Sequence, residues 1–441
     1  MSNPPITVDL RIDAGTIVPV VPSGVLAGHA LLVAGGSIVA IVPVALADAH
    51  YIARETVRLP SHVLIPGLVN AHTHAAMSLL RGIADDVPLQ PWLQQHIWPR
   101  EARLVAPDFV FDGTQLAAAE MLQGGITCCA DMYFHPADAA RAFEASGMRA
   151  MLGIPVLDFP TPYAADADAC LQHGLAARDA FAHAARLCFA LAPHAPYTVG
   201  DATWGKIVMY ARQLDLPIIT HLAETQAEVD DALRDTGVTP LTRLDALGAT
   251  GPAFIAVHAV HVTPADIALL AAQGGSVVHC PASNMKLASG IAPVQAMLDA
   301  GINVALGTDG CASNNRLDLF AEMRLASLLA KVATGNAASV PAARALQMAT
   351  LDGARALGLD AVTGSLEAGK FADVVAVDLD SVATSPVFDP ISHLVHAAGR
   401  ECVTDVWIGG TRIVNGRQLT TIDVNALLRR TRAWQRRIAS P

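Results

Sequence analysis

The stretch Ile65-Pro66-Gly67-Leu68-Val69-Asn70-Ala71-His72-Thr73-His74 is an apolar run that ends in two histidines separated by one residue. Alternate side chains of a β-strand point to the same face, so a strand here places His72 and His74 side by side. Two imidazoles at a strand end suit a divalent metal such as zinc. A pair of buried, hydrogen-bonded histidines fits the same pattern, and only further ligands elsewhere in the chain can decide between the two interpretations.

The composition limits the class of protein. The chain has 441 residues, of which 52% are hydrophobic, and this length favours one large domain plus a smaller one. A formal net charge of -11 does not favour nucleic acid or an anionic membrane as a partner. No apolar run is long enough to span a bilayer, and the stretch 1–5 lacks the features of a signal peptide. The 7 cysteines have no framework spacing, so we expect a cytoplasmic protein.

Both ends of the chain have the pattern of short strands. In residues 1–62, two apolar runs flank Gly35-Gly36, and in residues 373–441 two further runs flank Gly409-Gly410, which are hairpin signals. Neither end has enough strands to close a core alone, so we expect both to pair into one small β-sandwich. An arginine-rich segment at 426–438 follows as a C-terminal helix, for which a solvated face is favoured over a partner site.

Residues 63–372 differ in character, because short apolar runs alternate there with longer Ala- and Leu-rich helical segments. This rhythm predicts a parallel sheet, and eight such units predict a (β/α)8 TIM barrel. The segment 81–107, rich in Trp and Pro, is too long for a simple loop and is a candidate lid. The predicted strands are Val63–His72, Ile126–Tyr133, Ala150–Leu157, Leu187–Ala192, Pro217–His221, Phe254–His258, Ser276–His279 and Asn303–Gly307.

Polar residues stand at the carboxyl end of nearly every predicted strand, which in a barrel is the active-site face. A lone histidine at a strand end is more often structural than a ligand, but several strand ends here repeat the pattern. The repetition favours a mononuclear metal site. Beyond the first strand, these residues are His194, His221, Glu224, His258, His261, His279, Asn284 and Asp309.

The chain contains three motifs, P-G-L-V-N-A-H-T-H, H-L-A-E-T and L-G-T-D-G, and the segments 312–315 and 364–373. On the basis of these motifs and segments, the whole chain resembles the amidohydrolase superfamily. Within it, the chain is similar to the aminohydrolase branch that includes 5'-methylthioadenosine/S-adenosylhomocysteine deaminases, guanine deaminase and the triazine hydrolases. The segments 284–287, 290–293 and 322–324 fit the methylthioadenosine group best.

The resemblance implies one divalent metal ion per chain, Zn²⁺, on His72, His74, His221 and Asp309. No lysine stands at the end of the fourth strand to bridge a second metal. Three neutral imidazoles leave such a metal electrophilic, so that its water loses a proton near neutral pH. Asp309 is then expected to accept that proton, and His258 to hydrogen-bond the attacking oxygen.

Glu224 is expected to protonate a ring nitrogen and to pass a proton to the departing ammonia. The alternative for Glu224 is a surface carboxylate that caps the following helix. For substrate contacts beyond Glu224, we expect His194 to meet a ribose hydroxyl and Trp92 to cover the base, with Ser313 nearby. Trp92 could equally be a packed core residue. His261 and His279 are expected to be structural, and Asn284 is a further candidate.

The resulting expectation is hydrolytic deamination of an adenine nucleoside, foremost 5'-methylthioadenosine to 5'-methylthioinosine and ammonia. S-adenosylhomocysteine should be a weaker substrate, because residues 158–170 offer no Arg or Lys for its carboxylate, and adenosine should also be weaker. The alternatives are a deaminase or chlorohydrolase of guanine, a triazine or another heterocycle, and an inactive metal-binding scaffold, which the complete residue set disfavours. The expected partner is a small-molecule nucleoside, and the chain is compatible with a homodimer.

Overall fold

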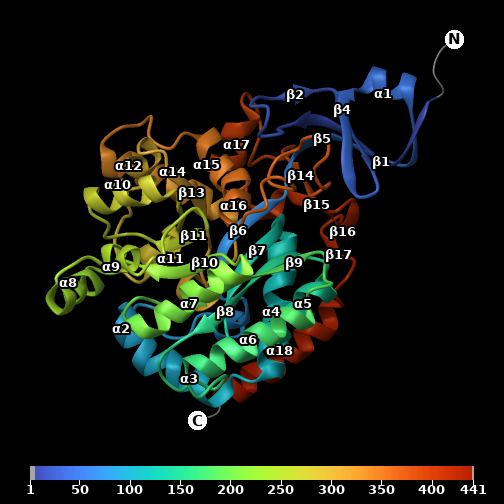
Figure 1. Ribbon diagram of the computed structural model, residues 1–441. Coiled ribbons are helices and arrows are strands. Elements are labelled where there is room, and N and C mark those ends of the chain that lie inside the picture. Colours follow the sequence, from blue (N-terminus) through green and yellow to red (C-terminus); the bar gives the residue numbers. More distant parts are fainter. Residues whose placement is uncertain (1–4, 440–441) are drawn as a thin grey trace.

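The computed structural model describes residues 5–439 (Figure 1). Residues 1–4, which belong to the stretch considered for a signal peptide and to the predicted N-terminal segment, lie outside the described residues, as do residues 440–441. Among the helices of the described part, none combines the length and the apolar character needed to cross a bilayer.

Strands from the two chain ends join in one mixed sheet, which confirms that both ends build a single small β-domain. Its strands follow the order β17-β16-β15-β14-β5-β1-β3-β4, with β2 beside β1, so they are hydrogen-bonded as one continuous sheet. The two ends meet where β14 runs antiparallel to β5. The strands are β1 (Ile6–Ile17), β2 (Leu26–Ala27), β3 (His29–Ala34), β4 (Ser37–Pro43), β5 (Tyr51–Pro66), β14 (Val374–Asp378), β15 (Val403–Ile408), β16 (Thr411–Asn415) and β17 (Gln418–Leu419).

The second sheet has eight parallel strands in sequential order, as predicted for the barrel. Its first and last strands approach each other, and the Asp309 amide donates to the His72 carbonyl at 3.0 Å. The strands are β6 (Leu68–Thr73), β7 (Ile126–Met132), β8 (Arg149–Val156), β9 (Leu187–Pro193), β10 (Ile218–Leu222), β11 (Phe254–His258), β12 (Ser276–His279) and β13 (Asn303–Leu306).

One predicted strand is divided. Residues 63–66 end β5 in the mixed sheet, and β6 of the barrel begins only at Leu68. Gly67 allows this passage, because a Cβ there would lie 2.0 Å from Thr127 Oγ1. β5 therefore crosses the predicted boundary between residues 62 and 63. The division into 1–62, 63–372 and 373–441 remains our proposal for the domains.

Helices surround the barrel strands (Figure 1). Thr263 starts α10 with a capping box, because its hydroxyl accepts from the Asp266 amide and the Asp266 carboxylate accepts from the Thr263 amide. The helices between and after the barrel strands include α4 (Pro107–Gln123), α5 (Pro136–Ser146), α6 (Ala167–Ala180), α7 (Asp201–Leu214), α8 (Gln226–Thr236), α9 (Pro240–Ala246), α10 (Pro264–Gln273), α14 (Leu319–Thr334), α15 (Ala342–Met348) and α16 (Leu351–Ala356).

The candidate lid is largely helical. After η1 (Ala75–Leu80), the segment contains α2 (Leu89–Pro91), η2 (Trp92–Ile97) and α3 (Trp98–Leu104). The C-terminal helix α18 (Val424–Ala439) lies along α4 (Figure 1), where Trp434 Nε1 donates to Asp112 Oδ2 at 2.9 Å and Arg430 Nε to Asp112 Oδ1 at 2.7 Å. One face of α18 is thus packed, while most of its arginines remain on the outside.

Candidate active site

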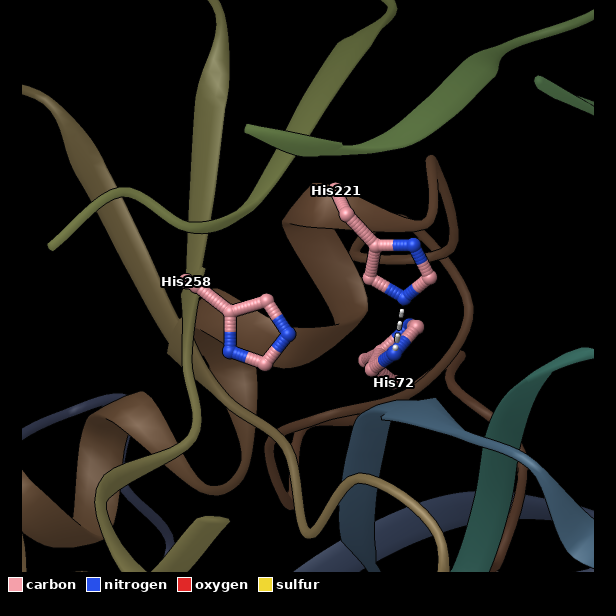
Figure 2. A group of neighbouring side chains, drawn as sticks. All are labelled: His72, His221 and His258. Atoms are coloured by element: carbon pink, nitrogen blue, oxygen red, sulfur yellow. Dashed lines mark hydrogen bonds between the residues drawn. The ribbon is translucent and has the colours of Figure 1, made fainter. Parts of the chain in front are cut away.

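The carboxyl ends of the barrel strands bring four predicted histidines and one carboxylate together. His72 Nε2 lies 3.2 Å from His221 Nε2, and Figure 2 shows both rings, with His258, pointing toward one another. Asp309 Oδ1 lies 3.4 Å from His72 Nε2 and 3.1 Å from His74 Nε2. These groups come from β6 and the residue directly after it, from β10 and β11, and from the segment after β13, so the site is formed by strands far apart in the sequence.

Hydrogen bonds on the far side of the rings orient two of the histidines. His74 Nδ1 contacts the Met132 carbonyl at 2.5 Å, and His221 Nδ1 contacts the His194 carbonyl at 2.7 Å. A carbonyl only accepts, so each Nδ1 carries the proton and each Nε2 presents its lone pair to the cluster when the ring is neutral. This is the orientation in which histidines bind metals.

Asp309 is held in a similar way. Its Oδ2 atom accepts from the hydroxyls of Ser283 at 2.6 Å and Ser313 at 2.7 Å. Its Oδ1 atom is buried and has no hydrogen-bond partner among the described residues. A buried carboxylate oxygen without a donor, facing imidazole nitrogens, fits a divalent cation, and three nitrogens with one carboxylate are an ordinary zinc donor set.

The protonation of the site also favours a cation. Burial lowers the pKa of His72 to about 4 and that of His221 well below its usual value, so both rings are neutral. Burial acts to raise the pKa of Asp309, but the neighbouring imidazoles of His72 and His74 hold it well below its usual range. Burial acts to lower the pKa of His74, but Asp309 raises it to about 9, so a metal would displace one proton there.

Glu224 and His258 lie next to this cluster. Glu224 Oε2 is 3.8 Å from His258 Nε2, and His258 Nδ1 contacts Asn284 Oδ1 at 2.8 Å. Burial raises the pKa of the Glu224 carboxyl group, and nearby His258 partly opposes this shift. Thr225, and not Glu224, is the N-cap of α8. Glu224 is therefore a buried wall residue of the cavity, and it is neither exposed nor the cap of the helix.

The lid and the strand ends enclose one cavity. Its polar lining includes His74, His221, Glu224, His258 and Asp309, and the predicted contacts His194, Trp92 and Ser313 also line it. His72 is fully buried behind this lining, against His221. Partial burial lowers the pKa of His194 to about 4, and its Nδ1 contacts Thr198 Oγ1 at 3.2 Å. The remaining wall is mostly apolar and is formed by Met77, Leu89, Leu93, Ile97, Trp98, Met132, Phe134, Pro155, Leu157, Ala192 and Leu287.

Two predicted structural histidines lie behind this wall. Neither His261 nor His279 is among the lining residues, and His261 Nε2 contacts the Ser289 carbonyl at 2.6 Å. His279 is fully buried at the end of β12, and its Nδ1 has no hydrogen-bond partner among the described residues.

Sequence reasoning missed several neighbours of the site. Tyr133 donates to Glu101 Oε1 at 2.6 Å inside the cavity, and burial raises the pKa of Glu101. No local pattern points to this pair, because its members lie in different elements. Ser283 stands beside the candidate Asn284 and could have been noticed there. Glu228 completes the pattern Thr225-Gln226-Ala227-Glu228, which is a capping-box signature.

An eight-stranded parallel barrel with a histidine–carboxylate cluster at the carboxyl ends of its strands is the architecture of a barrel enzyme with a metal site. The chain belongs to the amidohydrolase family, whose model matches residues 63–413.

The similarity to known proteins extends over the whole chain. A 5-methylthioadenosine/S-adenosylhomocysteine deaminase of Teredinibacter turnerae is 44% identical and covers 98% of each chain. The crystal structure of an adenosine deaminase from Xanthomonas campestris with bound zinc has a TM-score of 0.97 and 48% identity, covering 99% of each chain. An atrazine chlorohydrolase from Arthrobacter aurescens, complexed with zinc, has a TM-score of 0.90 at 24% identity over 97% of this chain and 100% of its own, which reflects the shared fold.

Proposed function

We propose that this chain is a metal-dependent hydrolase that deaminates an adenine nucleoside, with 5'-methylthioadenosine converted to 5'-methylthioinosine and ammonia as its main reaction. The observation that carries the proposal is the full-length similarity to deaminases of such nucleosides. The intact set of His72, His74, His221, Glu224, His258 and Asp309 supports it, since five of the six line one cavity and His72 contacts His221 and Asp309 directly behind it.

One divalent metal ion, Zn²⁺, is proposed per chain, held by His72, His74, His221 and Asp309. The converging nitrogen atoms and the unpartnered Asp309 Oδ1 support this ligand set. A zinc ion bound there supplies a water molecule of lowered pKa. No lysine lines the cavity among the described residues, which supports a single metal.

The chain's own residues then divide the proton transfers. Asp309 accepts a proton from the attacking water, while the serine hydroxyls on its second oxygen keep its first oxygen directed at the reacting centre. His258, fixed by Asn284, hydrogen-bonds the attacking oxygen. Glu224 gives a proton to the ring nitrogen, takes up the proton that the added hydroxyl group loses as the carbonyl forms, and delivers that proton to the departing ammonia. This role suits a carboxyl group whose burial raises its pKa. The proton that Asp309 accepted then returns to Glu224 through solvent, which restores both groups for the next cycle.

His194, Trp92 and Ser313 are proposed substrate contacts, because all three line the cavity. The neutral His194 ring suits a ribose hydroxyl, since an uncharged imidazole can donate or accept a hydrogen bond. Trp92 belongs to the lid, where its indole ring covers the base. The Ser313 hydroxyl is already donated to Asp309, so Ser313 contacts the substrate while it holds the catalytic carboxylate.

We place this activity in the cytoplasm. All seven cysteines are free thiols, which is typical of a reducing compartment. A homodimer remains a prediction for the assembly.

The decisive experiment is a panel of nucleosides and heterocycles with measurement of ammonia release and of metal content in the same preparation. Rapid ammonia release from 5'-methylthioadenosine, with guanine and a chlorinated triazine inert, would support the proposal. Chloride release from the triazine, or deamination of guanine alone, would assign the chain to one of the alternative activities.

A further inference from the structure

Glu228 makes two hydrogen bonds that the proposed chemistry does not use. Its Oε1 atom accepts from the Ala223 amide at 2.9 Å, and its Oε2 atom accepts from the Glu224 amide at 2.9 Å. Glu228 lies in the first turn of α8 and is only 9% exposed. One buried carboxylate therefore binds the amides of the two peptide groups that flank the α-carbon of Ala223, directly before Glu224.

The backbone at this point is strained. Ala223 has a φ of +48°, a left-handed conformation that is uncommon for a residue other than glycine. Its carbonyl accepts from the amides of Val260 at 3.1 Å and His261 at 2.9 Å, in the segment that follows β11. Glu228 on one side and the β11 segment on the other thus fix the two peptide groups of Ala223. Strained residues persist only where the surroundings hold them, and they concentrate at functional sites.

Helix capping does not account for this arrangement. In a capping box, the carboxylate at the third helical position accepts from the amide of the N-cap residue, which here is Thr225. The Glu228 carboxylate instead reaches the two residues before the cap. The Thr225 hydroxyl caps α8 independently, by accepting from the Glu228 amide at 3.3 Å.

We propose that Glu228 is a positioning residue for Glu224. Its carboxylate holds the left-handed turn at Ala223, so that the Glu224 side chain faces His258 and the cavity. This inference rests on the proposed role of Glu224. Without the carboxylate, two buried amides lose their acceptor and the turn can relax. A displacement of the reacting group by about 1 Å can cost about 100-fold in rate.

The test compares Glu228→Gln with Thr225→Ala, both metal-loaded. Glutamine keeps the size but turns an NH2 group toward one of the two amides, whereas Thr225→Ala removes the cap of the same helix and leaves both amides bound. We expect Glu228→Gln to lower kcat for deamination by about 10- to 100-fold, with KM and metal content nearly unchanged. Thr225→Ala should retain kcat even if its Tm falls as far as that of Glu228→Gln. Equal kcat losses in the two variants would overturn the inference.

A double-mutant cycle separates positioning from a general structural effect. If Glu228 acts through Glu224, adding Glu228→Gln to Glu224→Gln should lower kcat by less than about twofold further, because the two effects are not independent. Multiplying losses would contradict the inference, as would a wild-type kcat in Glu228→Gln beside an inactive Glu224→Gln. Glu228→Asp, which cannot span both amides, replaces Glu228→Gln if the latter does not fold. A wild-type protein that releases no ammonia from any nucleoside would instead refute the proposed function.

Discussion

Glu224 lies in the wall of the cavity with its carboxylate 3.8 Å from His258 Nε2. Glu224→Gln keeps the size of the side chain and all four proposed metal ligands, but it removes the proton that the proposed mechanism transfers. We expect kcat to fall by about 10²- to 10⁴-fold, the usual contribution of a general acid–base group, with metal content unchanged. Ammonia release and elemental analysis measure the two quantities. Glu144→Gln, at an exposed position on α5, is the matched control. A near-normal rate in Glu224→Gln would show that the proton comes from another group.

The proposed metal ligands give a second prediction at this scale. Because Asp309 Oδ1 faces both His72 and His74, either His72→Ala or Asp309→Ala should abolish turnover and metal retention together. A chelator should inactivate the wild-type protein, and one equivalent of Zn²⁺ per chain should restore it. Metal titration with an activity assay follows both effects. Two tightly held metals per active chain would contradict the single site.

The residues that the sequence makes predictable are those with a local signal. His72 and His74 share a face because of strand periodicity, and the barrel rule brings His221 and Asp309 to the same edge. The hydrogen bonds from Ser283 to Asp309 and from Tyr133 to Glu101 are not predictable, because each joins residues of different elements, although Ser283 itself stands beside the candidate Asn284. Glu228 has a local signal, but the signal predicts an ordinary capping box and not the contact with the Ala223 and Glu224 amides.

At the scale of elements, the barrel strands are predictable because each is a short apolar run with polar residues at its end. Two predicted strands, Phe254–His258 and Ser276–His279, match the observed bounds. The division of the first strand at Gly67 is not predictable, because the residues on both sides of the glycine are apolar and buried. The segment 81–107 is recognisable as a candidate lid, but its helices resist prediction because Pro88, Pro91 and Pro99 interrupt the helical pattern.

The lid is attached to the barrel through Lys286. Its Nζ donates to Asp85 Oδ1 at 2.6 Å, to Asn315 Oδ1 at 2.6 Å and to the Ala312 carbonyl at 3.0 Å. Asp85 belongs to the segment between η1 and α2, while Lys286 and Asn315 follow β12 and β13. One ammonium group therefore connects the start of the lid to two loops of the active-site face.

Lys286→Met should loosen this connection and raise KM for the nucleoside by about 3- to 10-fold, because binding must then also order the lid. Tm should change little, since partly exposed ion pairs contribute about 1 kcal/mol or less. Steady-state kinetics and thermal denaturation measure the two effects. The control is Lys206→Met, which removes an exposed ion pair with Asp168, and neither of these residues lines the cavity. An unchanged KM in Lys286→Met would show that the lid is held without this contact.

At the scale of the whole molecule, a buried ion pair joins the two sheets. Arg149 at the start of β8 donates through Nε to Asp373 Oδ2 at 2.7 Å, and Asp373 Oδ1 also accepts from the Gly409 amide at 2.7 Å. Asp373 directly precedes β14 of the mixed sheet. The mixed sheet is therefore bonded to the amino-terminal end of the barrel, opposite the cavity. The carboxyl ends of the barrel strands remain free to form the active site.

Buried carboxyl groups make the stability of the molecule depend on pH. Glu322 accepts from the Ala282 amide at 3.0 Å and from Asn314 Nδ2 at 2.7 Å, and burial raises its pKa to about 8. Since the folded pKa lies above the unfolded value, its stabilising contribution is complete below about pH 4.5 and is lost as the pH rises through about 8.

Glu322→Gln stays neutral at every pH. The free energy of unfolding of the variant minus that of the wild type should therefore increase between about pH 5 and pH 8.5, by at most ~5 kcal/mol, because only the wild type loses stability as the pH rises. Urea denaturation of the metal-loaded proteins at both pH values gives this difference. Glu144→Gln should show a constant difference. If the free-energy difference between Glu322→Gln and the wild type were also the same at both pH values, Glu322 would be ionised in the folded protein across this range.

We expect the 5' substituent of the nucleoside to lie in the part of the cavity between the lid and the ends of β7 and β8. Trp98 of the lid, Phe134, Pro155 and Leu157 form an apolar wall. Among the described residues that line the cavity there is no lysine or arginine, while Glu101 adds a carboxyl group. A methylthio group suits these surroundings, because it loses no polar contact on leaving water.

S-adenosylhomocysteine would bring a carboxylate into this region without a cationic partner. Since a charge-assisted hydrogen bond contributes about 1.5–3 kcal/mol, its absence should favour 5'-methylthioadenosine by at least about tenfold in kcat/KM, with adenosine intermediate because it lacks the apolar thioether. The control substrate is 5'-butylthioadenosine, which has a long substituent without charge. If it reacts nearly as well as 5'-methylthioadenosine while S-adenosylhomocysteine does not, charge and not length decides the preference. Comparable kcat/KM values for 5'-methylthioadenosine and S-adenosylhomocysteine would contradict the prediction and would require a basic residue, such as Arg81, to reach the carboxylate.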